Sequence, residues 1–300
     1  MGRFFFLFLV LSCSKPARNE PVALPFADKA LQEKRELYVS LLPTVRDVDG
    51  FVEWRECDSV HWTALVGAAT GPFNIRAVID DEGKLHRRPQ RHGECYPKNS
   101  KSENSRDAFL MVLAYGLATR DLDLIDGIFR YGKAHNWVMG KGPLSRTFFT
   151  LNMRSLYARA VQHLGGKKHQ ERLLPMAWPS GQTGYAAHLQ IVSILVDAKI
   201  EGGITEQGLK RILEHAQREP KNSLYVAALS RFDSQYAPIA TGLLLSEAWW
   251  PKDRLPTSAD RCEPWLTQRD DGESWLPCED GHTHSGGDYL FAEAVLSGHF

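Results

Sequence analysis

Residues 105–135, with the sequence SRDAFLMVLAYGLATRDLDLIDGIFRYGKAH, decide the fold class of this 300-residue chain. Apolar residues recur in this stretch at the three- and four-residue spacing of an α-helix, in two runs separated by a short polar break. The spacing predicts helices over 105–119 and 122–135. An acidic residue in the first turn, Asp107, suits a helix start because the helix dipole favours negative charge there.

The same spacing recurs on both sides of this stretch, with short breaks that contain glycine or proline. Gly165-Gly166 end one helix, and Gly202-Gly203 precede Thr205, a predicted N-cap. No stretch of alternating polar and apolar residues rivals these segments, so we expect an all-α fold. The further predicted helices span residues 28–42, 58–69, 145–164, 185–198, 205–219, 223–232, 238–249 and 287–296.

A weak internal repeat refines this expectation. Ser105-Arg106 and Ser145-Arg146 each stand at a predicted helix start, 40 residues apart, which is about the length of one helical hairpin. Hairpins of that period stack into an open solenoid or curl into an α/α toroid. Because the repeat covers only two units and long irregular loops are expected over 71–104 and 251–286, the toroid is preferred, as a complete or incomplete ring. An irregular helical bundle remains the alternative.

The N-terminus has the pattern of an export signal. Residues 1–12 contain one positive charge, on Arg3, and eight consecutive apolar residues, a run too short to span a bilayer. Residues 10–13, VLSC, resemble the lipobox of bacterial lipoproteins, which implies acylation of Cys13 after cleavage. By the same resemblance, Ser14 implies sorting to the outer membrane. The alternatives are an ordinary cleaved signal or a frayed apolar terminus.

The predicted organisation is therefore a signal peptide over 1–12, a polar tether over 13–27 and one helical domain over 28–300. Four further cysteines remain, an even number in an exported chain, and sequence proximity pairs Cys57 with Cys95 and Cys262 with Cys278. Free buried thiols are the alternative. Lys plus Arg equals Asp plus Glu at 36 each, which argues against a nucleic-acid partner.

Two of the places where polar groups coincide with helix starts are candidates for chemistry. Asp58 and His61 lie one turn apart beside Trp62, and together could face one substrate, although Asp58 also suits a simple N-cap. Arg106 and Asp107 begin a helix, and Arg146 recurs in the related segment. A guanidinium group suits carboxylates or sugar hydroxyls, while a structural Arg–Asp network between hairpins is the alternative.

The densest polar cluster is CEDGHTHSGGD at 278–288. Its two histidines, His282 and His284, make a weak metal signal without a third ligand, so no metal site is predicted. Hydrogen-bonding roles for His284 and Asp288 are preferred. The eight tryptophans could stack on sugar rings, with core packing as the default for each. No nucleotide-binding or other cofactor motif occurs, and no cofactor is predicted.

Residues 57–146 and 282–291 resemble, in their placement of Asp, Arg, His and Trp, uncharacterised bacterial and phage helical-toroid proteins. More distantly, they are similar to α/α-toroid glycoside hydrolases and polysaccharide lyases. The resemblance implies a carbohydrate-active protein held on the bacterial cell envelope by a lipid anchor, with a glycan or envelope polymer as its partner.

Two hypotheses follow. As a hydrolase, the protein would use Asp58 with Asp107 as its catalytic carboxylates and Asp288 as a substitute. As a lyase, it would need a base such as His61 or His284 and a cation such as Arg106 to neutralise a uronate carboxylate. As a binding scaffold, it would present the same platform without chemistry. We expect Asp58, Arg106, Asp107, His284 and Asp288 to converge on one concave face. The expected substrate-binding residues are His61, Trp62, Arg106, Arg146 and His284.

Overall fold

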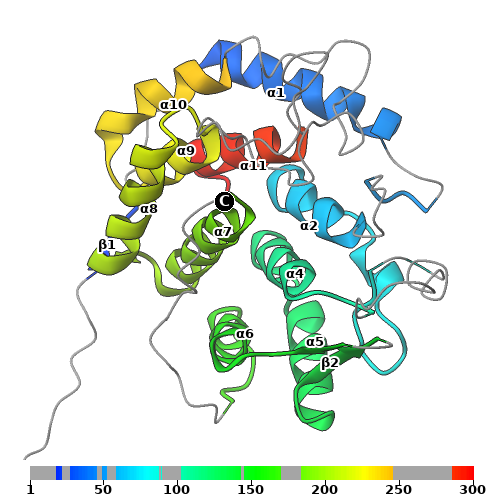
Figure 1. Ribbon diagram of the computed structural model, residues 1–300. Helices are drawn as coiled ribbons and strands as arrows, with labels where there is room; N and C mark the ends of the chain where they lie inside the picture. The colour runs from blue at the N-terminus through cyan, green and yellow to red at the C-terminus, as the bar shows by residue number, and fades with distance from the viewer. Residues whose placement is uncertain are drawn as a thin grey trace, which may run out of the picture.

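The computed structural model describes residues 18–21, 28–45, 49–52, 59–87, 89, 103–142, 145–169, 184–245 and 286–300. The described chain is mostly helical, which confirms the predicted all-α class (Figure 1). Its α-helices are α1 (Lys29–Leu41), α2 (Ser59–Thr70), α4 (Arg106–Ala118), α5 (Leu122–Ala134), α6 (Leu151–His163), α7 (Gly184–Glu201), α8 (Glu206–Arg218), α9 (Ser223–Ser230), α10 (Ala237–Leu244) and α11 (Gly286–Leu296). Short 3-10 helices span Leu42–Val45, Ile75–Val78 and Ser234–Tyr236.

Two groups of helices differ in how their apolar residues are distributed. In α2, α4, α7, α9 and α11 apolar residues occupy every face, and nearly all of the described side chains are buried. In α5 and α8, by contrast, apolar residues occupy one face and charged residues the other. A helix that is apolar all round needs neighbours on all sides, so the first group forms the interior.

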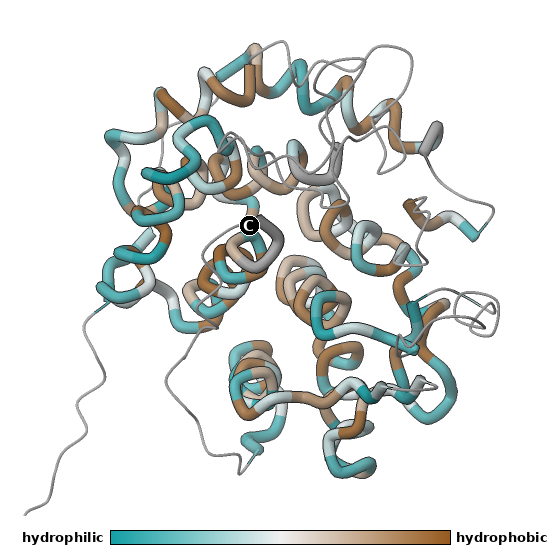
Figure 2. The backbone as a smooth tube through the Cα atoms, viewed as in Figure 1, coloured by the Kyte–Doolittle hydropathy of each residue, from teal (hydrophilic) through white to brown (hydrophobic). Residues whose placement is uncertain are grey.

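Contacts between helices agree with this division. The interior helix α2 packs against α4 and α11, α4 packs against α7, and α9 packs against both α7 and α11. Helices α1, α5, α6, α8 and α10 cover this group from outside (Figure 1). Figure 2 shows hydrophilic and hydrophobic residues mixed along the outer helix α1.

Side-chain caps fix several helix starts. The predicted N-cap Thr205 is confirmed, because its hydroxyl accepts a hydrogen bond from the Gly208 backbone N–H at 3.1 Å. Ser105 caps α4 in the same way, by accepting from the Ala108 N–H at 3.2 Å. Such a bond satisfies one of the backbone donors that the first helical turn leaves unpaired.

The predicted helix over 145–164 is wrong in its first part. Arg146–Phe148 form strand β3, which pairs antiparallel with β2 (Val138–Lys141), and α6 begins only at Leu151. The reason is tertiary: the Phe149 N–H donates to the carbonyl of Trp137, and the Thr147 hydroxyl donates to that of Asn104. Ser145-Arg146 therefore do not start a helix.

A second short strand pairing joins the N-terminal segment to the segment before α8. Strand β1 (Arg18–Asn19) pairs antiparallel with β4 (Ile204–Thr205), which leads into α8. These two residues of β1 belong to the segment predicted as a tether, and they are held on the domain by this pairing. Among the described residues, no helix is both long enough and apolar enough to cross a membrane.

Candidate functional site

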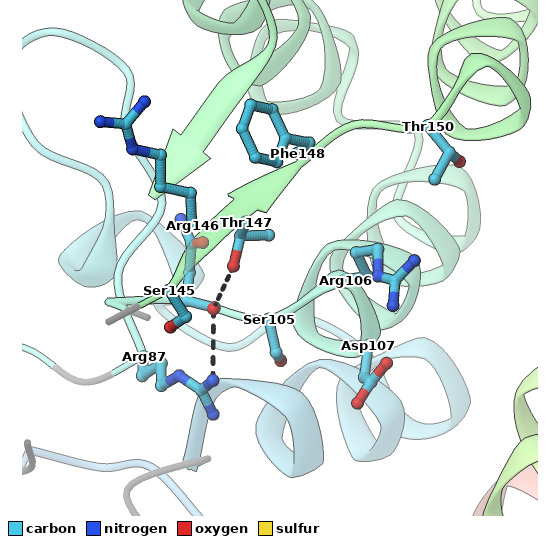
Figure 3. Close-up of a pocket in the computed structure, with 10 residues that line it drawn as sticks. Arg87, Ser105, Arg106, Asp107, Ser145, Arg146, Thr147, Phe148 and Thr150 are labelled. Atoms are coloured by element: carbon cyan, nitrogen blue, oxygen red, sulfur yellow. Dashed lines mark hydrogen bonds between the residues drawn. The ribbon is translucent and has the colours of Figure 1, made fainter. Parts of the chain in front are cut away.

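A pocket of about 460 Å³ opens between the start of α4 and the β2–β3 hairpin (Figure 3). It is lined by three arginines, one carboxylate, several hydroxyl groups and one aromatic ring. The lining residues are Arg87, Asn104, Ser105, Arg106, Asp107, Ser145, Arg146, Thr147, Phe148 and Thr150. The two Ser-Arg segments of the sequence repeat thus meet at one site, although one starts a helix and the other belongs to a strand.

The α4 side of the pocket is the first turn of a helix. Ser105 is the N-cap, and Arg106 and Asp107 follow as the first two helical residues. The unpaired N–H groups and the helix dipole give this end a partial positive charge. Arg106 is exposed, and within the part of the chain that the structure describes its guanidinium forms no ion pair or hydrogen bond.

Asn104 holds the two sides of the pocket together. It is fully buried, and its side-chain amide donates to the carbonyl of Leu85 at 3.0 Å and to the carbonyl of Met139. Its own backbone carbonyl accepts from the Thr147 hydroxyl at 2.8 Å and from the Arg87 guanidinium at 3.2 Å (Figure 3). A single residue therefore bonds the loop before α4, β2, β3 and the segment around residue 85.

The hairpin side contributes one cation and one ring. Residues of β3 alternate, so that Thr147 points inward while Arg146 and Phe148 stay exposed. Phe148 is 48% exposed, one of the exposed large apolar residues of the described chain, and it lines the pocket. Arg146 makes no ion pair with any described residue, and its guanidinium reaches outward at the rim (Figure 3).

Arg87 connects the pocket to the protein interior. It is buried, and its backbone carbonyl accepts from the Val60 N–H in the first turn of α2 at 3.2 Å. The neighbouring His61 is also buried. Burial, which is the largest cause, and the charges of His188 and Arg87 together lower the pKa of His61 to about 3. His61 is therefore neutral at physiological pH.

The structure brings together three of the predicted site residues, Arg106, Asp107 and Arg146. Two others, His61 and Trp62, are buried in the first turn of α2, where neither ring is presented to a ligand at the surface. The backbone of Asp288 lies in the first turn of α11, and its side chain is outside the described part of the structure. The other predicted site residues lie outside the described residues, namely Asp58, His284, the predicted acylation site Cys13, and the cysteines Cys57, Cys95, Cys262 and Cys278.

Sequence reasoning missed four lining residues that matter for the site, namely Arg87, Asn104, Thr147 and Phe148. Asn104 directly precedes the predicted N-cap, which was a usable signal for a residue at a helix entrance. Phe148 follows Arg146 by two residues, so the alternation of a strand would have placed both on one face. Nothing near Arg87 in the sequence marked it.

Among the described residues, no group of three or more His, Cys, Asp or Glu side chains is arranged to hold a metal ion. Comparison of the chain with protein-family models, with curated protein sequences and with solved structures finds no match. The function proposed below therefore rests on the geometry and charge of the site.

Proposed function

We propose that the pocket binds an anionic, hydroxyl-rich ligand, a glycan that carries carboxylate groups. The observation that carries this proposal is an imbalance of charge: Arg106 and Arg146 line the pocket without an ion pair to any described residue, and Asp107 is the only carboxylate among the described lining residues. Arg106 and Arg146 therefore bring two guanidinium groups to the pocket that no described carboxylate pairs.

The chemistry of the lining fits a sugar acid. Arginine presents a planar fork of N–H donors that matches a carboxylate. The hydroxyls of Ser105 and Thr150, each used as a cap at one helix end, border the same space and offer further polar contacts to sugar hydroxyls. The exposed ring of Phe148 supplies an apolar face for the C–H surface of a sugar.

Among the residues whose side chains the structure describes, the count of carboxylates at the pocket favours binding over hydrolysis. A glycosidase needs two, about 5–9.5 Å apart. Asp107 is one, and a second would have to come from Asp58 or from Asp288, neither of whose side chains the structure describes. A lyase would need an accessible base; of the two predicted bases, His61 is buried and His284 lies outside the described residues. We therefore propose that the chain is a glycan-binding protein of the cell envelope, anchored through acylated Cys13.

We further propose that the helices form an α/α toroid. It is supported by the order of contacts among the interior helices, in which α2, α4, α7, α9 and α11 each touch the next in chain order and the last touches the first. The amphipathic helices lie outside this circuit. Such an order fits a ring better than it fits an irregular bundle.

The binding test compares an acidic with a neutral oligosaccharide of equal length, for example oligogalacturonate and a glucose oligomer, by isothermal titration calorimetry. We expect Arg106→Ala to weaken binding of the acidic oligomer about 10- to 100-fold, the range for losing a charge-assisted hydrogen bond. Phe148→Ala should also weaken it. The matched controls, Arg130→Ala on the exposed face of α5 and Ile239→Ala on α10, should leave it unchanged.

Equal affinity for the neutral oligomer, or an unchanged affinity in Arg106→Ala, would contradict the proposal. Product analysis on the same mixtures distinguishes binding from catalysis, because release of shortened or unsaturated sugars would identify an enzyme. The anchor is tested separately: mass spectrometry of the membrane fraction should find an acylated N-terminal cysteine, and Cys13→Ala should abolish it. An unmodified chain that retains residues 1–12 would refute the anchor.

A further inference from the structure

We propose that the exposed basic face of α8 lies against an anionic lipid surface, with the glycan pocket held on the opposite side of the molecule. This orientation rests on the proposed acylation of Cys13. Three features of the described chain support it: the docking of β1, the short reach from Cys13 to β1, and the charge of α8.

The first feature is a built docking site for the N-terminal segment. Besides the pairing of β1 with β4, the Arg18 guanidinium donates to the carbonyl of Gly203 at 2.9 Å and to the Asp197 carboxylate at 3.2 Å. Arg159 donates to the same Asp197 carboxylate and to Glu201. All four charged side chains are mostly buried, between 10% and 21% exposed, so solvent screens these ion pairs less than it screens surface pairs.

The fit at Gly203 shows that the docking is close. A Cβ atom added to Gly203 would lie 2.7 Å from the backbone oxygen of Asn19, a separation that side chains do not adopt. Pro21, further along the same segment, lines a second pocket, beside Leu195 and Lys199 of α7. The segment is thus held at residues 18 and 19.

The second feature is reach. Cys13 precedes Arg18 by five residues, and five residues span at most about 18 Å when fully extended. Because β1 is fixed to β4, acyl chains on Cys13 would keep this side of the domain within that distance of the membrane interface. The predicted tether of residues 13–27 would leave far more freedom if it were not docked.

The third feature is the charge of the helix beside the docking site. β4 packs against α8. The exposed residues of α8 include Lys210, Arg211 and Arg218, with Lys221 directly after the helix. Glu206 is exposed as well, and the partly exposed Glu214 pairs with Arg211 at 2.8 Å, so these four cations outnumber the two carboxylates by two. Basic side chains within a short distance of a membrane are attracted by anionic headgroups. A lipid surface therefore complements this face.

The pocket lies far from this face. Figure 1 shows β1 and α8 at one side of the molecule, and α5 with β2 at the other side. With α8 against the lipid, the pocket between α4 and the β2–β3 hairpin faces away from the bilayer, where an envelope polymer can reach it.

The experiment compares the reactivity of two exposed lysines in the full acylated chain, reconstituted into vesicles that contain phosphatidylglycerol. Lys210 on α8 would face the lipid, and Lys133 at the end of α5 is the matched control. A water-soluble acetylating reagent is applied, and labelling at each site is measured by mass spectrometry against the same chain in detergent. We expect Lys210 to be labelled several-fold less in vesicles and Lys133 to be unchanged.

Gly203→Ala and Arg18→Ala both release β1 without touching α8, so each should restore much of the labelling of Lys210 while the protein still floats with the vesicles. Equal labelling of Lys210 and Lys133 in a chain that floats would overturn the orientation and leave the anchor intact. A chain that carries no acyl group and does not float would overturn both. Protection of Lys210 that persists in both release variants would also overturn the role given to the docked segment.

Discussion

Replacing Asn104 with alanine tests whether one buried side chain holds the pocket together. Asn104 is fully buried, and its amide group donates to two backbone carbonyls, that of Leu85 at 3.0 Å and that of Met139 in β2. Alanine removes both donors and leaves both carbonyls in place. Since the site is closed to solvent, water replaces the lost donors only if the structure opens.

The magnitude follows from these two bonds. A buried acceptor left unpaired costs about 1–3 kcal/mol, so leaving two of them unpaired in Asn104→Ala should lower the free energy of unfolding by about 2–6 kcal/mol. That is a large fraction of the roughly 5–15 kcal/mol that stabilises a typical domain. Asn104→Asp keeps the shape but replaces the donors with a buried charge, so its effect should be at least as large.

Urea unfolding at neutral pH, followed by circular dichroism, measures the effect through the midpoint and slope of the transition. The matched control is Asn74→Ala, because Asn74 is exposed and its side chain makes no cap hydrogen bond. This variant should stay within about 0.5 kcal/mol of the natural chain. If Asn104→Ala costs less than about 1 kcal/mol, the idea that this residue ties the hairpin to α4 is refuted.

Two further predictions concern the interior helices. Gly67→Ala should destabilise the protein by about 1–3 kcal/mol, because the added Cβ would lie 2.7 Å from the Tyr115 ring. Gly127→Ala has open space around the added Cβ and should stabilise the protein by about 0.5–1 kcal/mol. Equal shifts of the two variants in urea unfolding would contradict the α2–α4 packing. Burial, with the charges of His188 and Arg87, lowers the pKa of His61 from 6.5 to about 3. Between these two pH values only the unfolded chain binds this proton. The contribution of His61 to the free energy of unfolding is therefore fully present above about pH 6.5 and is lost as the pH decreases toward 3. His61→Gln should reduce the slope of unfolding free energy between pH 6 and 4 by about 1.4 kcal/mol per pH unit, and an unchanged slope would show that His61 titrates normally.

Most of the helices can be predicted from the sequence, because an α-helix is closed by hydrogen bonds between residues four apart and marked by local caps. Helix 105–119 and helix 122–135 were predicted within one residue of α4 and α5 at each end. The sequence also held a signal that was not used: the even apolar composition of α9 and α11 already marks them as interior helices.

The site, by contrast, depends on contacts between segments that are far apart in the sequence. Arg146 was selected because it was expected to start a helix, yet it lies in β3, whose pairing with β2 depends on contacts between separate segments. Arg87 and Phe148 reach the pocket for the same reason, because Asn104 joins their segments through hydrogen bonds that span 17 to 43 residues of sequence. Helices follow from local spacing, whereas a pocket built from a loop, a helix start and a strand exists only after the chain has packed.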